Sequence, residues 1–244
     1  MIEIRDLRKA FGEVQAVDGV TFSAEDGRVT GLLGPNGAGK TTTLRILYGL
    51  IAADAGIASV DGVDSTRDPD GVRRRLGVLP DDRGLYPRLT AREHMRYFGG
   101  LHGLGGQDLE RRIDELIDVL DMGTIANRPT AGFSQGERVK VAIGRALVHG
   151  PSHVVLDEPT NGLDVMAARA MRELIGRLRD EGKCVLFSSH VMQEVAALCD
   201  HIVVIAAGRV VAEGTPGELI ESTGSKSLED AFIVAVGSAE GLVQ

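Results

Sequence analysis

Hydrophobic and polar residues follow two distinct patterns along this chain. Five short runs are almost wholly apolar, which is typical of strands covered on both faces of a sheet. These runs are residues 29–33, 76–80, 153–157, 184–189 and 201–206. Four further segments alternate in polarity or border glycine turns, and we predict that they form an antiparallel layer. They are residues 1–7, 16–22, 56–62 and 209–214.

Helical spacing dominates between about residues 88 and 148, where no strand pattern appears. Apolar residues recur there on one helix face, at positions 109, 113, 116, 117 and 120. Thr90 with Glu93, and Ser134 with Glu137, have the spacing of a capping box, so each pair predicts the start of a helix. The whole pattern predicts an α/β protein that has a mostly parallel central sheet and a helical insertion.

The composition is that of a globular protein. The chain has 244 residues, 43% of them hydrophobic, which suffices for one large domain or a domain with a subdomain. No apolar run reaches the roughly 18–20 residues that span a bilayer, and the N-terminal segment is too charged for a signal peptide, so we expect a cytoplasmic protein. The net charge of −8 argues against a general nucleic-acid binder. Cys184 and Cys199 lie in apolar segments and are expected to be reduced core residues.

The strongest motif is the glycine-rich stretch that follows the run at residues 29–33. It matches G-x-x-x-x-G-K-[ST] between a predicted strand and a predicted helix. Backbone N–H groups of such a loop turn toward phosphate, and the helix N-terminus adds its positive dipole end. Lys40 is expected to bridge the β- and γ-phosphates, and the Thr41 hydroxyl to bind Mg²⁺. The predicted nucleotide contacts in this loop are Gly34, Pro35, Asn36, Gly37, Ala38, Gly39, Lys40, Thr41 and Thr42.

Two further apolar runs end in polar side chains suited to phosphate chemistry. Asp157 closes the run at residues 153–157 and is predicted to bind the metal. Glu158 follows directly and is the candidate general base for an attacking water. His190 ends the run at residues 184–189 and could hydrogen-bond a phosphate oxygen, although a lone histidine is more often structural. No lysine lies in the N-K-x-D pattern that reads guanine, which disfavours GTP.

The helix start at residues 134–137 contains a glycine that capping does not need. Gly136 lies inside the first turn, where glycine costs roughly 0.5–1 kcal/mol relative to alanine. One interpretation is an exposed turn that tolerates the glycine, and at this point the reason for Gly136 stays open.

Together these motifs resemble the ATP-binding subunit of an ABC transporter over nearly the whole chain. In that family "GPNGAGKTT" is the Walker A loop, "HVVLDE" is Walker B, "SSH" contains the switch histidine, and "NGLD" is the D-loop with Asp164. "FSQGE" takes the place of the signature motif. The resemblance implies a P-loop NTPase (RecA-like) core with an antiparallel β layer and an inserted α-helical subdomain. It places the domain at residues 1–230, with the core at about 1–87 and 149–222, the helical subdomain at about 88–148, and a short C-terminal tail at 223–244.

The family also implies a head-to-tail dimer in which each signature helix faces the ATP held by the other subunit. Gly136 would then let the backbone approach a γ-phosphate of the partner. The signature residues expected to act on the partner's ATP are Ser134, Gln135, Gly136 and Glu137. Phe11 matches the aromatic residue that stacks on adenine, with an ordinary core phenylalanine as the alternative.

Two positions depart from the family pattern. Asp81 stands where the Q-loop glutamine is expected, and it remains a candidate metal-site residue because a carboxylate can bind Mg²⁺. The signature has Gln135 and Glu137 where glycine and glutamine are usual, so Glu137 is expected to serve chiefly as a helix cap.

Both departures resemble those of ABC-2-type exporters, most of all the sodium-efflux (NatA-like) branch. The resemblance implies an ATPase that uses ATP and Mg²⁺ and forms a dimer, which we expect to contain two identical chains. It also implies that the protein drives a separate transmembrane permease from the inner face of the membrane, without a nucleic-acid partner. Residues 85–101 would form the groove for the permease, with Tyr86, Leu89, Tyr97 and Phe98 as candidate contacts. Export of a drug, antibiotic or lipid, and a soluble ABC ATPase that acts on DNA or ribosomes, are the alternatives.

Overall fold

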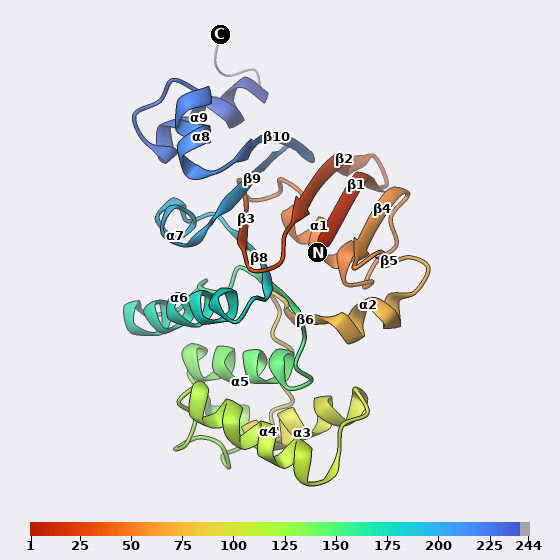
Figure 1. Cartoon of the computed structure of the whole chain (residues 1–244), viewed down its shortest axis with the longest axis vertical. Helices are drawn as coiled ribbons and strands as arrows, with labels where there is room; N and C mark the ends of the chain where they lie inside the picture. The colour runs from red at the N-terminus through yellow and green to blue at the C-terminus, as the bar shows by residue number, and fades with distance from the viewer. Residues whose placement is uncertain (240–244) are drawn as a thin grey trace.

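The computed structural model describes residues 1–239, which form two sheets and a separate helical region (Figure 1). The larger sheet has six strands in the order β10-β9-β3-β8-β7-β6. Its strands are β3 (Val29–Leu33), β6 (Leu76–Leu79), β7 (His153–Asp157), β8 (Cys184–Ser189), β9 (His201–Ala206) and β10 (Arg209–Gly214). The five apolar runs are its five parallel strands, which confirms the prediction of a mostly parallel central sheet.

The smaller sheet is antiparallel, with the strand order β2-β1-β4-β5. It comprises β1 (Ile2–Phe11), β2 (Val14–Ala24), β4 (Ala55–Val60) and β5 (Val63–Asp64). The prediction that residues 209–214 belong to this layer was wrong, because β10 pairs with β9 at the edge of the larger sheet. Ala207 and Gly208 have φ angles of 48° and 75°, as in the tight two-residue turns that keep consecutive strands side by side.

The helical region is inserted between β6 and β7, which are neighbours in the sheet. It contains α3 (Ala91–Leu101), α4 (Gly106–Val119), the short 3-10 turn η1 (Thr130–Gly132) and α5 (Gln135–Leu147). Both predicted capping boxes are confirmed, at the starts of α3 and α5. The predicted apolar face is also confirmed, since Leu109, Ile113, Leu116 and Ile117 of α4 are buried. Because the insertion joins adjacent strands, the parallel sheet remains continuous beside it.

The remaining helices cover the sheets. They are α1 (Lys40–Leu47), α2 (Pro69–Arg75), α6 (Val165–Asp180), α7 (Met192–Leu198), α8 (Pro216–Ser222) and α9 (Leu228–Ala239). One buried cluster fills the space between the two sheets, and a second joins the other face of the larger sheet to the helical region. The segment assigned to a short tail contains α9, whose Leu228 and Ala231 are buried. The last five residues of that segment, 240–244, lie outside the described residues.

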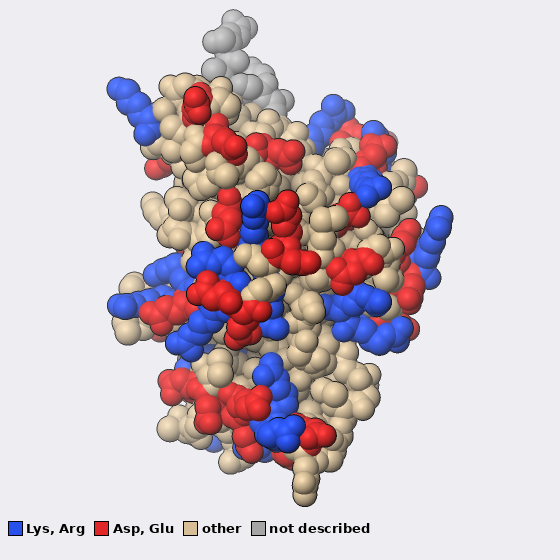
Figure 2. Space-filling view, viewed as in Figure 1, with Lys and Arg blue, Asp and Glu red and all other residues tan. Residues whose placement is uncertain are grey.

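Both cysteines are buried and neither forms a disulfide, as expected. Over residues 1–239, none of the helices is long and apolar enough to cross a membrane. Lys and Arg are interspersed with Asp and Glu over the face shown in Figure 2.

Candidate nucleotide-binding site

The glycine-rich loop is a tight turn between β3 and α1. Gly37 and Gly39 have φ angles of 81° and 106°, a conformation that glycine adopts without strain. A side chain at Gly34 would collide with the carbonyl oxygen of Ile205, and one at Gly39 with that of Ala16. The neighbouring backbone therefore requires glycine at both positions, and α1 begins at Lys40 with its N-terminus beside the loop.

The loop borders a cavity of about 420 Å³ that gathers residues from distant parts of the sequence. The lining residues are Ala16, Asn36, Gly37, Ala38, Gly39, Lys40, Thr41, Thr42, Asp81, Glu158, Asn161 and His190. The structure thus brings loop residues 36–42 together with Asp81, Glu158 and His190, whereas Gly34, Pro35 and Asp157 lie outside this lining. Ala16 was not singled out from the sequence because it belongs to none of the motifs. Asn161 is the first residue of the D-loop "NGLD", but it was not predicted to be a site residue.

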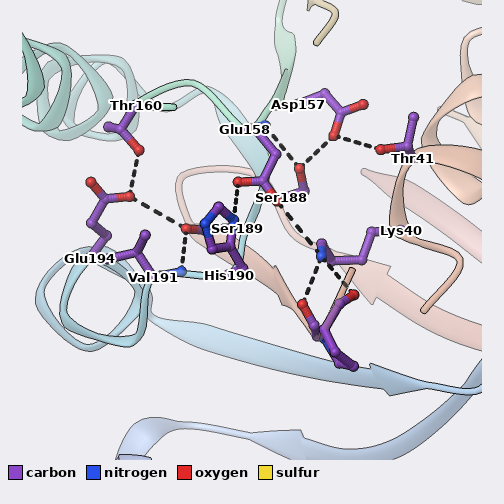
Figure 3. Close-up of polar contacts among 12 residues, drawn as sticks. Lys40, Thr41, Asp157, Glu158, Thr160, Ser188, Ser189, His190, Val191 and Glu194 are labelled. Atoms are coloured by element: carbon purple, nitrogen blue, oxygen red, sulfur yellow. Dashed lines mark hydrogen bonds and ion pairs between the residues drawn. The ribbon is translucent and has the colours of Figure 1, made fainter. Parts of the chain in front are cut away.

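The Lys40 side chain is buried and folds back over its own loop (Figure 3). Its Nζ donates to the carbonyl oxygens of Gly34 at 2.7 Å and Pro35 at 3.2 Å, and lies 3.7 Å from Oε1 of Glu158. Burial lowers the pKa of Lys40, while the charges of Glu158 and Asp157 oppose that shift. The arrangement holds a cation at the wall of the cavity, where the phosphates of a nucleotide would meet it.

Asp157 is buried, and only one of its two carboxylate oxygens accepts hydrogen bonds from residues 1–239 (Figure 3). Its Oδ1 accepts from the hydroxyls of Ser188 at 2.6 Å and Thr41 at 3.2 Å. Its Oδ2 is buried and has no hydrogen-bond partner among residues 1–239. Burial raises the pKa of Asp157 above its ordinary value. A free carboxylate oxygen beside a threonine hydroxyl suits a hard divalent cation such as Mg²⁺.

Glu158 and His190 both line the cavity and contact each other directly, with 2.9 Å between Oε2 and Nδ1. Glu158 has a φ angle of 48°, which costs a non-glycine residue on the order of 1–3 kcal/mol. Its backbone N–H donates to Oγ of Ser188 at 2.9 Å, which holds the peptide in this strained turn. Ser188 thus supports both acidic residues. Ser188 was not predicted from the sequence, although it is a polar residue near the end of an apolar strand, two residues before His190.

Other predicted site residues lie outside the lining of this cavity. Phe11 is 51% exposed, and Nζ of Lys9 lies 5.5 Å from its ring centroid. Asp164 caps α6 by accepting from the N–H of Ala167 at 2.8 Å. The signature segment, residues 134–137, forms the first turn of α5.

The first turn of α5 has no internal need for a glycine. Oγ of Ser134 accepts from the N–H of Glu137 at 3.2 Å, and Oε2 of Glu137 accepts from the N–H of Ser134 at 2.7 Å. A methyl group added at Gly136 would meet, within residues 1–239, only Cβ of Ala167 at 3.4 Å, an ordinary van der Waals contact. The packing of one chain therefore does not explain Gly136.

Comparison with known proteins shows the family to which this geometry belongs. The sequence profile of the family described as "ABC transporter" matches residues 17–161, more than half of the chain. The chain belongs to the ABC transporter family. It is 43% identical to the ABC transporter ATP-binding protein NatA of Bacillus subtilis (strain 168), over 96% of this chain and 97% of that protein.

Other ABC relatives and solved ABC structures agree with this assignment. The chain is 33% identical to the linearmycin resistance ATP-binding protein LnrL of the same organism, over 98% of this chain and 79% of that protein. It is 40% identical to the Nod factor export ATP-binding protein I of Burkholderia lata, over 91% and 73%. A solved ATP-binding subunit of an ABC transporter superposes with a TM-score of 0.89 at 30% identity, covering 96% of this chain and 99% of that one.

The ABC fold predicted from the motifs is confirmed. The protein is an ABC-type ATPase and the ATP-binding subunit of a transporter. The dimeric structure of a bacterial ABC transporter cassette also matches, with a TM-score of 0.81 at 26% identity, covering 88% of this chain and 98% of that one.

Substitution of Gly136 tests whether this glycine is needed for the stability of the single chain or for ATP turnover by a dimer. Gly136→Ala should raise the free energy of unfolding by up to about 1 kcal/mol, because alanine favours the helix and the methyl group makes only an ordinary contact with Ala167. The same change should lower ATP turnover roughly ten- to hundredfold, because a methyl group forced into a tight contact costs about 1–3 kcal/mol. Urea unfolding and steady-state phosphate release measure the two effects.

Gly176→Ala in α6 is the matched control, since a methyl group there would also be free of collisions and would meet nothing within 4 Å among residues 1–239. It should be stabilising to a similar degree and leave turnover unchanged. Normal turnover in Gly136→Ala would contradict a close contact at this glycine.

Proposed function

We propose that this protein hydrolyses ATP to drive the export of sodium ions through a separate transmembrane permease. The observation that carries the ATPase chemistry is the cavity that joins Lys40, Glu158 and His190 to the phosphate loop, with Asp157 hydrogen-bonded to Thr41 in its wall. Export is supported by relatives whose names describe Nod factor export and linearmycin resistance. Sodium rests on the resemblance of Asp81, Gln135 and Glu137 to the sodium-efflux branch.

ATP would bind with its phosphates on the N–H groups of residues 34–42. Lys40 would exchange its bonds with the Gly34 and Pro35 carbonyls for bonds with β- and γ-phosphate oxygens. Thr41 and Asp157, with Asp81 at the cavity wall, would hold Mg²⁺. When bound, Mg²⁺ neutralises charge on the β- and γ-phosphates. Phe11, exposed on the β1 edge, would stack on adenine.

Glu158 would act as the general base. Its Oε1 faces Lys40 and its Oε2 contacts His190, so the carboxylate is held between a cation and a hydrogen-bonding ring. A water molecule beside Glu158 would attack the γ-phosphorus while its proton passes to the carboxylate and ADP leaves. His190 would orient Glu158 and donate to a γ-phosphate oxygen from its other ring nitrogen.

The active unit would be a head-to-tail homodimer. The N-terminus of α5 carries Ser134, Gln135, Gly136 and Glu137 on the surface, where the helix dipole favours an anion. Close to Asp164, Val165 and Met166 are 79% and 72% exposed, a large exposure for apolar side chains that a second subunit would cover.

The permease would bind in a groove of about 1090 Å³ between the core and the helical region. Five arginines against three aspartates line it, which favours an acidic partner segment. The arginines are Arg45, Arg73, Arg74, Arg83 and Arg145. Nε and Nη2 of Arg83 are buried and lack hydrogen-bond partners among residues 1–239, so a carboxylate could pair with both.

Only one of the four candidate contacts, Phe98, lines this groove, and Arg145 lies over its ring at 4.7 Å from the centroid. Tyr86 and Tyr97 are about half exposed and contact each other edge to face beside the groove lining. The groove would hold the protein as a peripheral subunit at the inner face of the membrane. The net charge of −8 and the mixed charges in Figure 2 support a function without nucleic acid.

Replacing the proposed base should arrest the cycle after ATP binding. Glu158→Gln keeps the size of the side chain but accepts a proton poorly, so we expect an ATP-bound dimer with turnover lowered by roughly a hundredfold or more. Size-exclusion chromatography with light scattering, in ATP and Mg²⁺, measures the dimer.

The double variant Glu158→Gln/Ser134→Arg is the control, because it leaves the Walker A loop intact and places a bulky cation at the signature. It should bind ATP and remain monomeric. A Glu158→Gln protein that is monomeric at saturating ATP would contradict its role as the base.

The substrate is tested in vesicles that contain this protein and its permease. We expect ATP to drive movement of radioactive sodium out of the cytoplasmic side, and Lys40→Ala, which loses the phosphate contact, to abolish it. ATP-driven transport of a drug, antibiotic or lipid without sodium would replace sodium as the substrate. An ATPase that neither co-purifies with a membrane protein nor responds to one would favour the soluble alternative.

A further inference from the structure

A histidine, a cysteine and an aspartate meet at the edge of the larger sheet that is opposite the nucleotide cavity. His153 and Cys184 are the first residues of β7 and β8 and pair directly with each other. Asp26 lies in the turn between β2 and β3. One ligand atom from each residue lies within 4.8 Å of the other two. Since β7 ends at Asp157, roughly 13 Å of strand separates this cluster from the nucleotide site.

His153 presents a free ring nitrogen to the cluster. Its side chain is buried, and Nε2 lies 2.7 Å from Oδ1 of Asp61 and 3.2 Å from the Met1 ammonium nitrogen. Because the shorter contact is to an acceptor, we assign the proton to Nε2. Nδ1 therefore carries a lone pair. It is buried, has no hydrogen-bond partner within residues 1–239, and lies 3.7 Å from Oδ1 of Asp26. An unpaired nitrogen of this kind costs free energy unless a ligand satisfies it.

Cys184 and Asp26 supply the other two donor atoms. The Cys184 thiol is fully buried, and its Sγ–H donates weakly to the carbonyl oxygen of Ala24 at 3.5 Å. Burial raises the pKa of this thiol to about 12. The Asp26 side chain is 60% exposed and gives solvent a path to the cluster. The Met1 ammonium donates to Asp26 and Asp61 at 2.8 Å and is the competing cation.

We propose that Asp26, His153 and Cys184 form a binding site for a zinc-class divalent cation. A carboxylate oxygen, an imidazole nitrogen and a thiolate suit Zn²⁺, whereas Mg²⁺ and Ca²⁺ prefer oxygen ligands only. A water molecule completes four ligands. Asp61 orients the imidazole through Nε2, as carboxylates do behind metal-bound histidines. On binding, the S–H bond of Cys184 breaks, an S–metal bond forms and the proton passes to solvent.

Such an ion would join the β2–β3 turn to the first residues of β7 and β8. It would therefore tie the antiparallel sheet to the parallel one and raise the unfolding temperature of the whole protein by mass action. The site is independent of ATP binding, because its residues lie at the opposite ends of the strands from Lys40 and Asp157.

Cobalt(II) binding to the reduced, full-length protein tests the site. We expect one Co²⁺ per chain with a sulfur-to-cobalt absorption band in the near ultraviolet and the visible bands of tetrahedral cobalt. Zn²⁺ should displace the bands and raise the unfolding temperature. Cys184→Ala should lose the sulfur band, and Cys199→Ala, which removes the other buried thiol, should keep it. Asp26→Asn should bind Co²⁺ at least about tenfold more weakly than the unchanged protein.

A wild-type protein without the sulfur band would overturn the proposal, and so would a band that persists in Cys184→Ala. If Cys184→Ala does not fold, Asp26→Asn decides, because it changes only an exposed side chain and unchanged cobalt affinity would exclude the site. Cobalt bound by Thr41 and Asp157 would not produce the sulfur-to-cobalt band, since those side chains contain no sulfur.

Discussion

Strands β3, β8 and β7 run parallel and in register, so their carboxyl ends meet at one edge of the larger sheet. Leu33 pairs with Ser189, and Asp157 pairs with Ser188. The N-terminus of α1 reaches the same edge and brings Thr41 to Asp157. If this register were lost, every residue of the site would still be present, but Thr41, Asp157 and Ser188 would no longer meet. The fold acts on function chiefly through this alignment.

Burial disfavours the charged forms of two residues in the nucleotide site. Burial lowers the pKa of Lys40 and raises that of Asp157, while Glu158 is held in a left-handed backbone conformation. In the proposed mechanism a polyphosphate and a divalent cation would offset these costs, because they would satisfy the same groups. Nucleotide binding would thereby be coupled to the stability of the core.

Much of the fold could be predicted from local patterns. The apolar runs identified the parallel strands, and the capping boxes at Thr90 and Ser134 marked the starts of α3 and α5. Features set by pairing between distant segments could not be predicted in this way. The position of β10 depends on the turn at Ala207, and the role of Ser188 depends on its register opposite Asp157.

The same reason explains why some buried groups could not be assigned from the sequence. The buried fork of Arg83 in the groove, and the pairing of His153 with Cys184, appear only once the strands are assembled. Gly136 is the opposite case: it was conspicuous in the sequence, and the structure removes the explanation by packing within one chain.

The central claim is that each ATP is hydrolysed between the Walker A loop of one subunit and the signature helix of another. Mixing two inactive variants tests it most directly: Lys40→Ala, with a normal signature, and Ser134→Arg, with a normal Walker A loop. A mixed head-to-tail dimer contains one intact composite site, so the mixture should hydrolyse ATP faster than either variant alone at the same total concentration. A mixture no more active than the mean of the two variants would contradict the claim.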